Sequence, residues 1–160
     1  MRYSHIFVLI GCFLSISATA QQANNPASSQ LNVTTRSFLD RLRQDLTNVT
    51  EERDAEPVYD RIFDRNGYAT GVFKKLRCRR LEGPDDLRRI GAAMVEGAFS
   101  KSGKIRDDRM ADVNSNWRNF QAICPDEIGY ANIFFEELKA LLKERATEFH
   151  AKQLAEKNRL

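Results

Sequence analysis

The densest group of charged side chains in this sequence surrounds a cysteine. Residues 74–80 read Lys-Lys-Leu-Arg-Cys-Arg-Arg, and the basic side chains are Lys74, Lys75, Arg77, Arg79 and Arg80. A cluster of this kind can bind phosphates, anionic lipid or a nuclear import receptor. The alternative, which we favour, is a solvated basic face whose charge is balanced by Glu82, Asp85 and Asp86.

Side chains that could act as a catalytic base are few. After residue 20 the chain has one histidine, His150, which lies in a charged stretch and is expected to be exposed. Acidic pairs occur at 85–86, 107–108 and 136–137, but neighbours on a helix do not face one site, so we expect them to be solvated or to cap helices. We therefore predict no catalytic residue, no metal site and no cofactor. A small all-helical enzyme that works through arginine and lysine electrostatics remains an alternative, because it would need no short motif.

Residues 1–20 predict an export signal. Arg2 and His5 precede an apolar run over 6–16, and Ala18-Thr19-Ala20 is a small-x-small cleavage pattern. The run is shorter than the roughly 20 residues that cross a bilayer, so we expect a cleaved signal, no membrane span and a secreted product. Residues 21–34 are polar and aperiodic, which predicts a flexible tail.

Secretion determines the interpretation of the cysteines. Cys12 is removed with the signal, which leaves Cys78 and Cys124 in an oxidising compartment. The simplest expectation is one disulfide, which would stabilise the fold by about 4 kcal/mol in the chain-entropy view. Two separate buried thiols are the alternative.

Two Asn-x-Thr sequons predict a glycoprotein. They are Asn32-Val33-Thr34 and Asn48-Val49-Thr50, and a glycan on either would require a surface position.

Hydrophobic spacing predicts an all-α fold. Apolar residues recur at steps of three and four along the chain, and no useful alternating strand pattern is present. We expect a bundle of four to six helices with one disulfide, in which Trp117, Phe120, Phe134 and Phe135 are core residues. Helices are predicted over 35–53, 57–66, from Pro84 to 99, over 106–123, and from Pro125 to a charged, frayed end at 151–160.

Composition limits the function. The net charge of +3, or +2 without Arg2, argues against a general nucleic-acid binder, and a hydrophobic content of 42% fits a globular domain. We expect a non-enzymatic protein that binds another protein.

The segment before residue 54 resembles the leader of oomycete RxLR–dEER secreted effectors. A signal and polar tail are followed by Arg36-Ser37-Phe38-Leu39, by 41–43 (Arg-Leu-Arg) and by Glu51-Glu52-Arg53. The last motif matches, whereas the strict Arg-x-Leu-Arg form is absent. The leader residues carried over are Arg36, Leu39, Glu51, Glu52 and Arg53. A C-terminal module with a stacked Trp and Tyr, common in that family, would use Trp117 and Tyr130.

The resemblance implies a virulence protein that enters host cells. Residues 35–53 would then be the effector leader rather than an N-terminal helix, and 54–160 would be the helical effector domain that binds host proteins and modulates defence. The cluster at 74–80 would serve as a nuclear import signal. The rival interpretation is an extracellular, cytokine-like or carrier-like helical binding protein, which explains the disulfide and the sequons directly.

Overall fold

The protein is an all-α bundle, as the periodicity predicts. The computed structural model describes residues 31–63, 69–73, 76–80 and 82–159, so the predicted signal and most of the predicted tail lie outside the described residues. Within these ranges there are six α-helices, one 3₁₀ turn and no strand. The elements are α1 (Val33–Thr47), α2 (Glu52–Phe63), α3 (Ala69–Phe73), α4 (Gly83–Phe99), α5 (Asp107–Ile123), η3 (Pro125–Glu127) and α6 (Ile128–Lys157).

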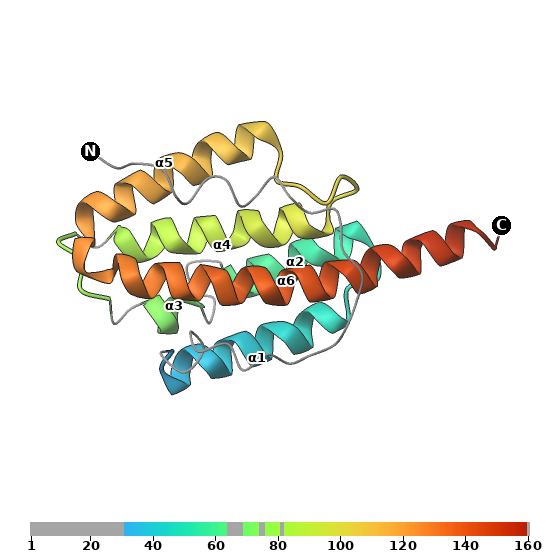
Figure 1. Cartoon of the computed structure of the whole chain (residues 1–160), viewed down its shortest axis with the longest axis horizontal. Helices are drawn as coiled ribbons and strands as arrows, with labels where there is room; N and C mark the ends of the chain where they lie inside the picture. The colour runs from blue at the N-terminus through green and yellow to red at the C-terminus, as the bar shows by residue number, and fades with distance from the viewer. Residues whose placement is uncertain (1–30, 64–68, 74–75, 81, 160) are drawn as a thin grey trace.

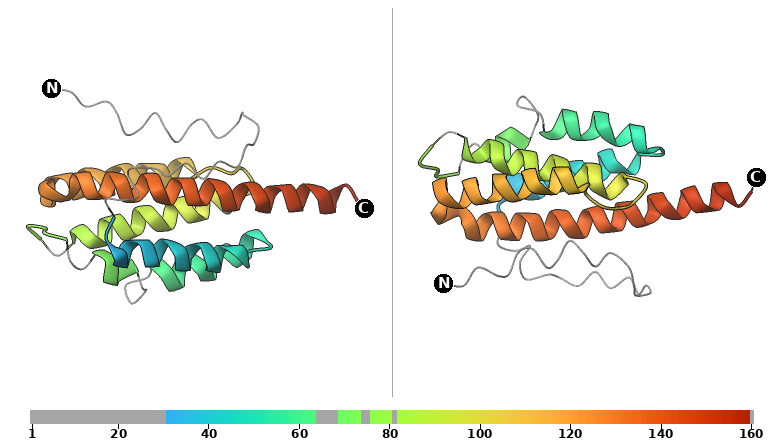
Figure 2. Two further views of the ribbon diagram at one scale, coloured as in Figure 1. Left: turned by 60° about the horizontal axis from the view of Figure 1, so that its bottom comes forward. Right: turned by 90° about the horizontal axis from the view of Figure 1, so that it is seen from above.

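Helix α4 lies at the centre of the bundle (Figure 1). It packs against α2, α3, α5 and α6, whereas α5 lies at one edge and α1 at the other (Figures 1 and 2). A helix surrounded in this way must bury residues on several sides. Accordingly Leu87, Ile90, Val95 and Phe99 are all buried, and Gly91 lets the Phe63 ring of α2 approach the α4 backbone.

Aromatic rings join the N-terminal helix to the rest of the core. The ring of Phe134 in α6 lies 5.8 Å from that of Phe38 in α1 and 5.1 Å from that of Phe73 in α3. Trp117 stacks on Phe120 at 5.7 Å and meets the edge of Phe135. The prediction that these aromatic residues belong to the core is confirmed, although Phe135 is only partly buried.

The boundaries of the first two helices differ from the prediction. The helix expected over 35–53 starts earlier and ends at Thr47, where the Asn48 N–H turns back to the Asp45 and Leu46 carbonyls. The flexible tail predicted to residue 34 is wrong from Leu31 onward, because Leu31 is buried and Asn32 caps α1 through its side chain.

Helix α2 begins at Glu52 rather than at Pro57. The Asp54 carboxylate accepts hydrogen bonds from the N–H groups of Thr50 and Glu51, at 3.0 and 2.8 Å, which satisfies donors at the helix start. Pro57 therefore lies inside the helix, where it cannot donate to the preceding turn. The buried face of α2 stabilises the helix despite this lost bond. Helix α2 also runs through residues 53 and 54, where an effector leader would end.

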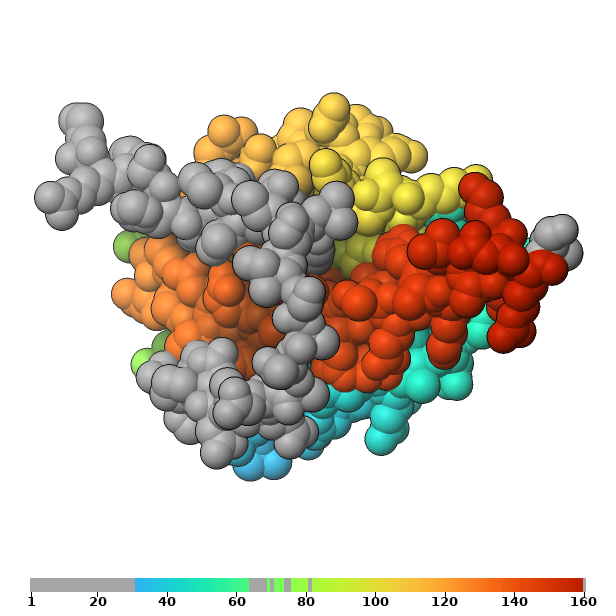
Figure 3. Space-filling model, turned by 45° about the vertical axis from the view of Figure 1, so that its right-hand side comes forward, coloured from blue at the N-terminus to red at the C-terminus, as the bar shows by residue number. Residues whose placement is uncertain are grey.

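The later helices follow the prediction closely. Pro84 stands in the first turn of α4, Gly103 adopts a φ of 64° in the turn after it, and η3 at Pro125 leads into α6. The end of α6 is helical to Lys157 rather than frayed, and residues 151–159 are exposed. Its C-terminal part runs beside the α1–α2 connection (Figure 3), where the Gln153 side chain donates to the Thr50 carbonyl. No described helix is both long and apolar enough to cross a membrane.

Candidate functional site

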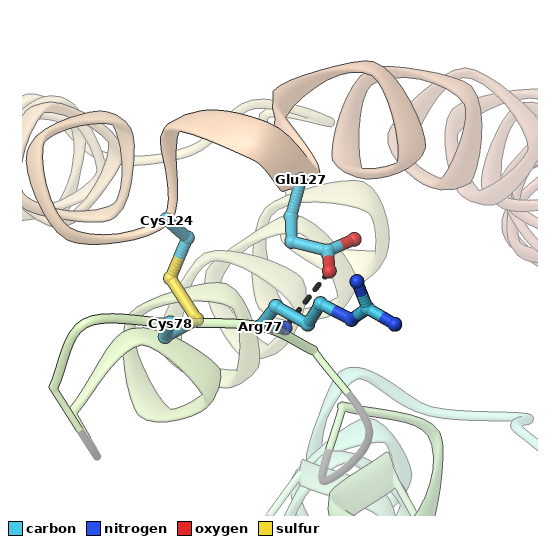
Figure 4. Close-up of a disulfide and its surroundings, with 4 residues drawn as sticks. All are labelled: Arg77, Cys78, Cys124 and Glu127. Atoms are coloured by element: carbon cyan, nitrogen blue, oxygen red, sulfur yellow. Dashed lines mark hydrogen bonds between the residues drawn. A yellow bond between two sulfur atoms is a disulfide. The ribbon is translucent and has the colours of Figure 1, made fainter.

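The predicted cysteine pair marks one end of the candidate site. The sulfur atoms of Cys78 and Cys124 lie 2.02 Å apart, which joins the segment after α3 to the end of α5 (Figure 4). This geometry confirms the predicted pairing. The disulfide lies directly against Gly83, the first residue of α4. A Cβ built there would lie 2.7 Å from the Cys78 sulfur and would overlap the Cys124 sulfur.

Two hydrogen bonds donated by backbone N–H groups fix the same segment. The Arg77 N–H donates to the Glu127 carboxylate at 2.8 Å (Figure 4), and the Arg79 N–H donates to the Ile123 carbonyl at 2.7 Å. The chain around Cys78 is therefore held to the α5–η3 end by a covalent bond and two hydrogen bonds. The sequence carries no signal for either hydrogen bond, because each joins residues that are far apart in the sequence and meet only through tertiary packing.

A polar cleft of about 700 Å³ opens beside this tether. We call it the disulfide cleft. A volume of this size falls within the range of ligand pockets in proteins. Three segments line it, namely the residues after Cys78, the first turns of α4 and the last turn of α5. The lining residues are Arg79, Arg80, Glu82, Asp85, Asp86, Arg89, Asn119, Ala122 and Ile123.

Asp86 is the unusual member of this lining. Asp86 is only 5% exposed, although it lines the cleft. The pKa of Asp86 is raised to about 6, mainly by burial; Arg89 opposes the shift, and the Asp85 and Glu82 charges contribute to it. Of the two alternatives expected for the pair 85–86, solvated or at a helix start, the solvated one is wrong for Asp86. It stands in the first turn of α4, as expected for a helix-start acid, and is buried there.

A second polar cleft of about 510 Å³ adjoins the first and shares Arg89 and Asn119 with it. It runs along the groove between α4 and α5, with Tyr59 of α2 at its border. An ion pair of 3.4 Å between Arg109 and Glu96 bridges the two helices there. Burial and nearby carboxylates raise the pKa of Tyr59. We call the two clefts together the α4–α5 face.

The basic cluster is divided by the fold. Lys74 and Lys75 lie outside the described residues, whereas Arg77, Arg79 and Arg80 are exposed. Arg79 and Arg80 line the disulfide cleft together with Glu82 and Asp85–Asp86. The structure thus brings two of the predicted basic residues, Arg79 and Arg80, to one site with the balancing acids. Arg89 and Asn119, which complete the cleft, were missed by sequence reasoning because nothing in the sequence marks the approach of α5.

Both sequon asparagines are exposed at the ends of α1. The Asn32 side-chain oxygen accepts a 2.9 Å hydrogen bond from the Thr35 N–H, and Asn48 is the C-cap residue. These positions meet the surface requirement of a glycan, and glycosylation itself stays a prediction.

The residues of the leader motif have different environments. Arg36 is exposed, but Leu39 is buried in the core. Glu51, Glu52 and Arg53 are exposed, and they line another cleft of about 710 Å³ with residues of α6. The fold therefore separates Leu39 from the surface on which the other four lie.

His150 also borders that third cleft. The expectation of an exposed histidine is wrong, because the residue is partly buried and its Nε2 lies 3.1 Å from the Ala98 carbonyl oxygen. The end of α4 presents carbonyl groups without helical partners, and the ring satisfies one of them. This contact gives His150 a structural role in joining α6 to α4.

The described ranges contain no group of three or more histidine, cysteine or acidic residues that could hold a metal ion. No protein-family model, no curated protein and no solved structure matches this chain.

Proposed function

We propose that this chain is a secreted, non-enzymatic helical protein that acts by binding another protein through the α4–α5 face. The observation that carries the proposal is the continuity of two clefts, of about 700 and 510 Å³, across Arg89 and Asn119. Together they form an extended polar surface, and arginine is among the residues enriched at protein interfaces.

The position of α5 supports this assignment. The helix packs on α4 and reaches α6 through Trp117, so its remaining sides face outward at the edge of the bundle. It buries only Val113, Trp117 and Phe120. An edge helix held by a few large apolar residues can present polar side chains without loss of core packing.

The disulfide adds rigidity to one end of this face. It fixes the segment that carries Arg79 and Arg80, so these arginines are positioned before a partner arrives. Preorganisation of this kind lowers the entropic cost of binding. An oxidising, extracellular setting is consistent with such a bond.

A capture experiment with matched variants tests the proposal. The disulfide-bonded mature protein would be immobilised and exposed to extracellular fluid from its source, together with Asn119→Trp and Asn132→Trp variants. Both asparagines are exposed, but only Asn119 lies in the α4–α5 face. We expect a partner that binds the wild type and Asn132→Trp and is lost with Asn119→Trp. Equal capture by both variants would contradict the proposal.

A pathogen effector that modulates host defence is the second candidate. The observation that favours it is the surface position of Glu51, Glu52 and Arg53, which leaves this motif accessible to a processing or uptake factor. The N-terminus and intact mass of the naturally secreted protein test it. Cleavage between Arg36 and Arg53 without glycans would support the effector, and a chain that begins at Gln21 with glycans on Asn32 or Asn48 would support the extracellular binding protein.

A further inference from the structure

The disulfide cleft combines both signs of charge on its walls. Three arginines and three carboxylates line it, so its formal charge is balanced when all six groups are ionised. A ligand with a single charge would be attracted by one set of groups and repelled by the other. A ligand that carries both charges, suitably spaced, would be attracted by both.

Asp86 is the group in this cleft that gains most from a ligand. Its residue is 5% exposed and lines the cleft, where the charge of Arg89 only partly offsets the effect of burial on its carboxyl group. Burial of a carboxylate is unfavourable, and an additional cationic N–H donor would offset this cost. The wall of the cleft therefore carries a largely buried carboxylate to which a cationic group of a ligand could bind.

Arg79 and Arg80 offer the complementary function. Both are exposed, and the guanidinium group presents a planar fork that can bind a carboxylate through two parallel hydrogen bonds. The hydrogen bond from the Arg79 N–H to Ile123 and the disulfide at Cys78 fix the backbone from which these side chains extend. The anion-binding and cation-binding groups thus line one cleft.

We infer that the disulfide cleft takes a mixed-charge segment of a partner protein, in which a lysine or arginine side chain pairs with Asp86 and a nearby carboxylate pairs with Arg79 or Arg80. This inference rests on the proposed function and specifies its contact. A protein segment suits the cleft better than a free small molecule, because the cleft continues through Arg89 and Asn119 into the second cleft of the α4–α5 face.

Peptide titration tests the inference on the full mature, disulfide-bonded protein at pH 8. The probes are acetylated, amide-capped glycine peptides that carry one arginine and one glutamate, separated by one to three glycines. Matched peptides replace either the arginine or the glutamate with glutamine. Affinity and site would be read from backbone amide shifts in nuclear magnetic resonance spectra. We expect the best mixed-charge peptide to bind about tenfold more tightly than either singly charged peptide, with shifts concentrated in residues 79–89.

Three variants make the result specific. Asp86→Asn should lower the affinity of the mixed and cationic peptides about tenfold and leave the anionic peptide unchanged. Ala122→Trp should prevent all three kinds of peptide from entering the disulfide cleft. Ala122 is exposed and lines the disulfide cleft but not the second cleft. Asp40→Asn, at an exposed position of α1 on the far edge of the bundle (Figure 1), is the control and should change nothing.

Two outcomes would overturn the inference: equal binding of mixed and singly charged peptides, or unchanged binding after Asp86→Asn in a variant whose helical spectrum shows that it is folded. If the mixed-charge peptides do not bind more tightly than the singly charged ones, but Asn119→Trp still abolishes capture of a partner, this inference is wrong and the proposed function stands. If capture is also insensitive to Asn119→Trp, both are wrong.

Discussion

The α-carbon of Gly83 faces the sulfur of Cys124 so closely that a methyl group on Gly83 would overlap it. The first turn of α4, the disulfide and the cleft that carries Asp86 are consequently packed as one unit. Only a residue without a side chain permits this approach.

Replacement of Gly83 by alanine should therefore destabilise the protein. We expect a loss of about 1–3 kcal/mol, because the inserted methyl group must displace the sulfur atoms or the helix. Gly129→Ala is the matched control near the start of α6, where a Cβ would meet no atom within 4 Å. It should be neutral or stabilising by up to about 1 kcal/mol, since alanine favours helix. Denaturant unfolding of the disulfide-bonded proteins measures both, and equal stability of the two variants would contradict the close packing.

The disulfide should contribute strongly to stability. It closes a loop with a sequence separation of 46. Its removal by Cys78→Ala with Cys124→Ala is expected to cost about 4 kcal/mol through the greater entropy of the unfolded chain. Urea unfolding of the double variant and the oxidised wild type gives the difference. The pairing itself is wrong if both thiols of the unreduced, denatured wild type react with an alkylating agent.

Asp86 should make stability depend on pH. Its pKa rises from 3.8 in the unfolded chain to about 6 in the folded protein, so ionisation is less favourable after folding. The wild type therefore loses stability as the pH rises from about 4 through about 6. Asp86→Asn removes this loss, so the variant should match the wild type near pH 4 and exceed it above pH 6, by at most about 3 kcal/mol.

Part of that gain will be offset, because an ionised acid in the first turn of α4 interacts favourably with the helix dipole. Asp85→Asn serves as the control for helix-end effects. Asp85 pairs with Arg88 at 3.3 Å, and its replacement should give no gain at high pH. The test is to measure the free energy of unfolding at several pH values. A difference between Asp86→Asn and the wild type that does not change with pH would contradict the raised pKa of Asp86.

Leu39 should behave as a core residue rather than as part of a separable leader. Its side chain is 8% exposed within α1, which packs on α6. Leu39→Ala is expected to cost about 2–4 kcal/mol through lost burial and the cavity left behind. Arg36→Ala, on the exposed side of the same helix, should change stability by no more than about 0.5 kcal/mol. Thermal and urea unfolding compare them, and a neutral Leu39→Ala would mean that α1 contributes little to the fold.

Local patterns were sufficient to predict most of the helices. Steps of three and four residues located α4, α5 and α6, and two remaining cysteines in a predicted secreted chain indicated the disulfide. These features depend on hydrophobic periodicity and on composition, which a single sequence contains. The division between α1 and α2 was predicted several residues too late, because the apolar stripe runs on to Val49 whereas the Asp54 carboxylate caps a helix that starts at Glu52.

The candidate site was predictable only in part. The basic residues at 79–80 and the acids at 82–86 were recognised as neighbours in sequence, but the cleft that they line is completed by residues of α5. The approach of α5 is set by core packing between α4 and α5, which periodicity does not position. Arg89 and Asn119 became site residues for the same reason. Tertiary contacts, rather than local sequence, therefore determine the electrostatics of the cleft.

Photo-crosslinking is the most direct test of the central claim that the α4–α5 face binds a protein. A photoreactive amino acid would be placed at Asn119 and, in a second preparation, at Asn132, and each protein would be irradiated in extracellular fluid from its source. The account predicts a covalent adduct with a discrete protein from position 119 and none from position 132. The same adduct at equal yield from both positions, or from position 132 alone, would contradict it.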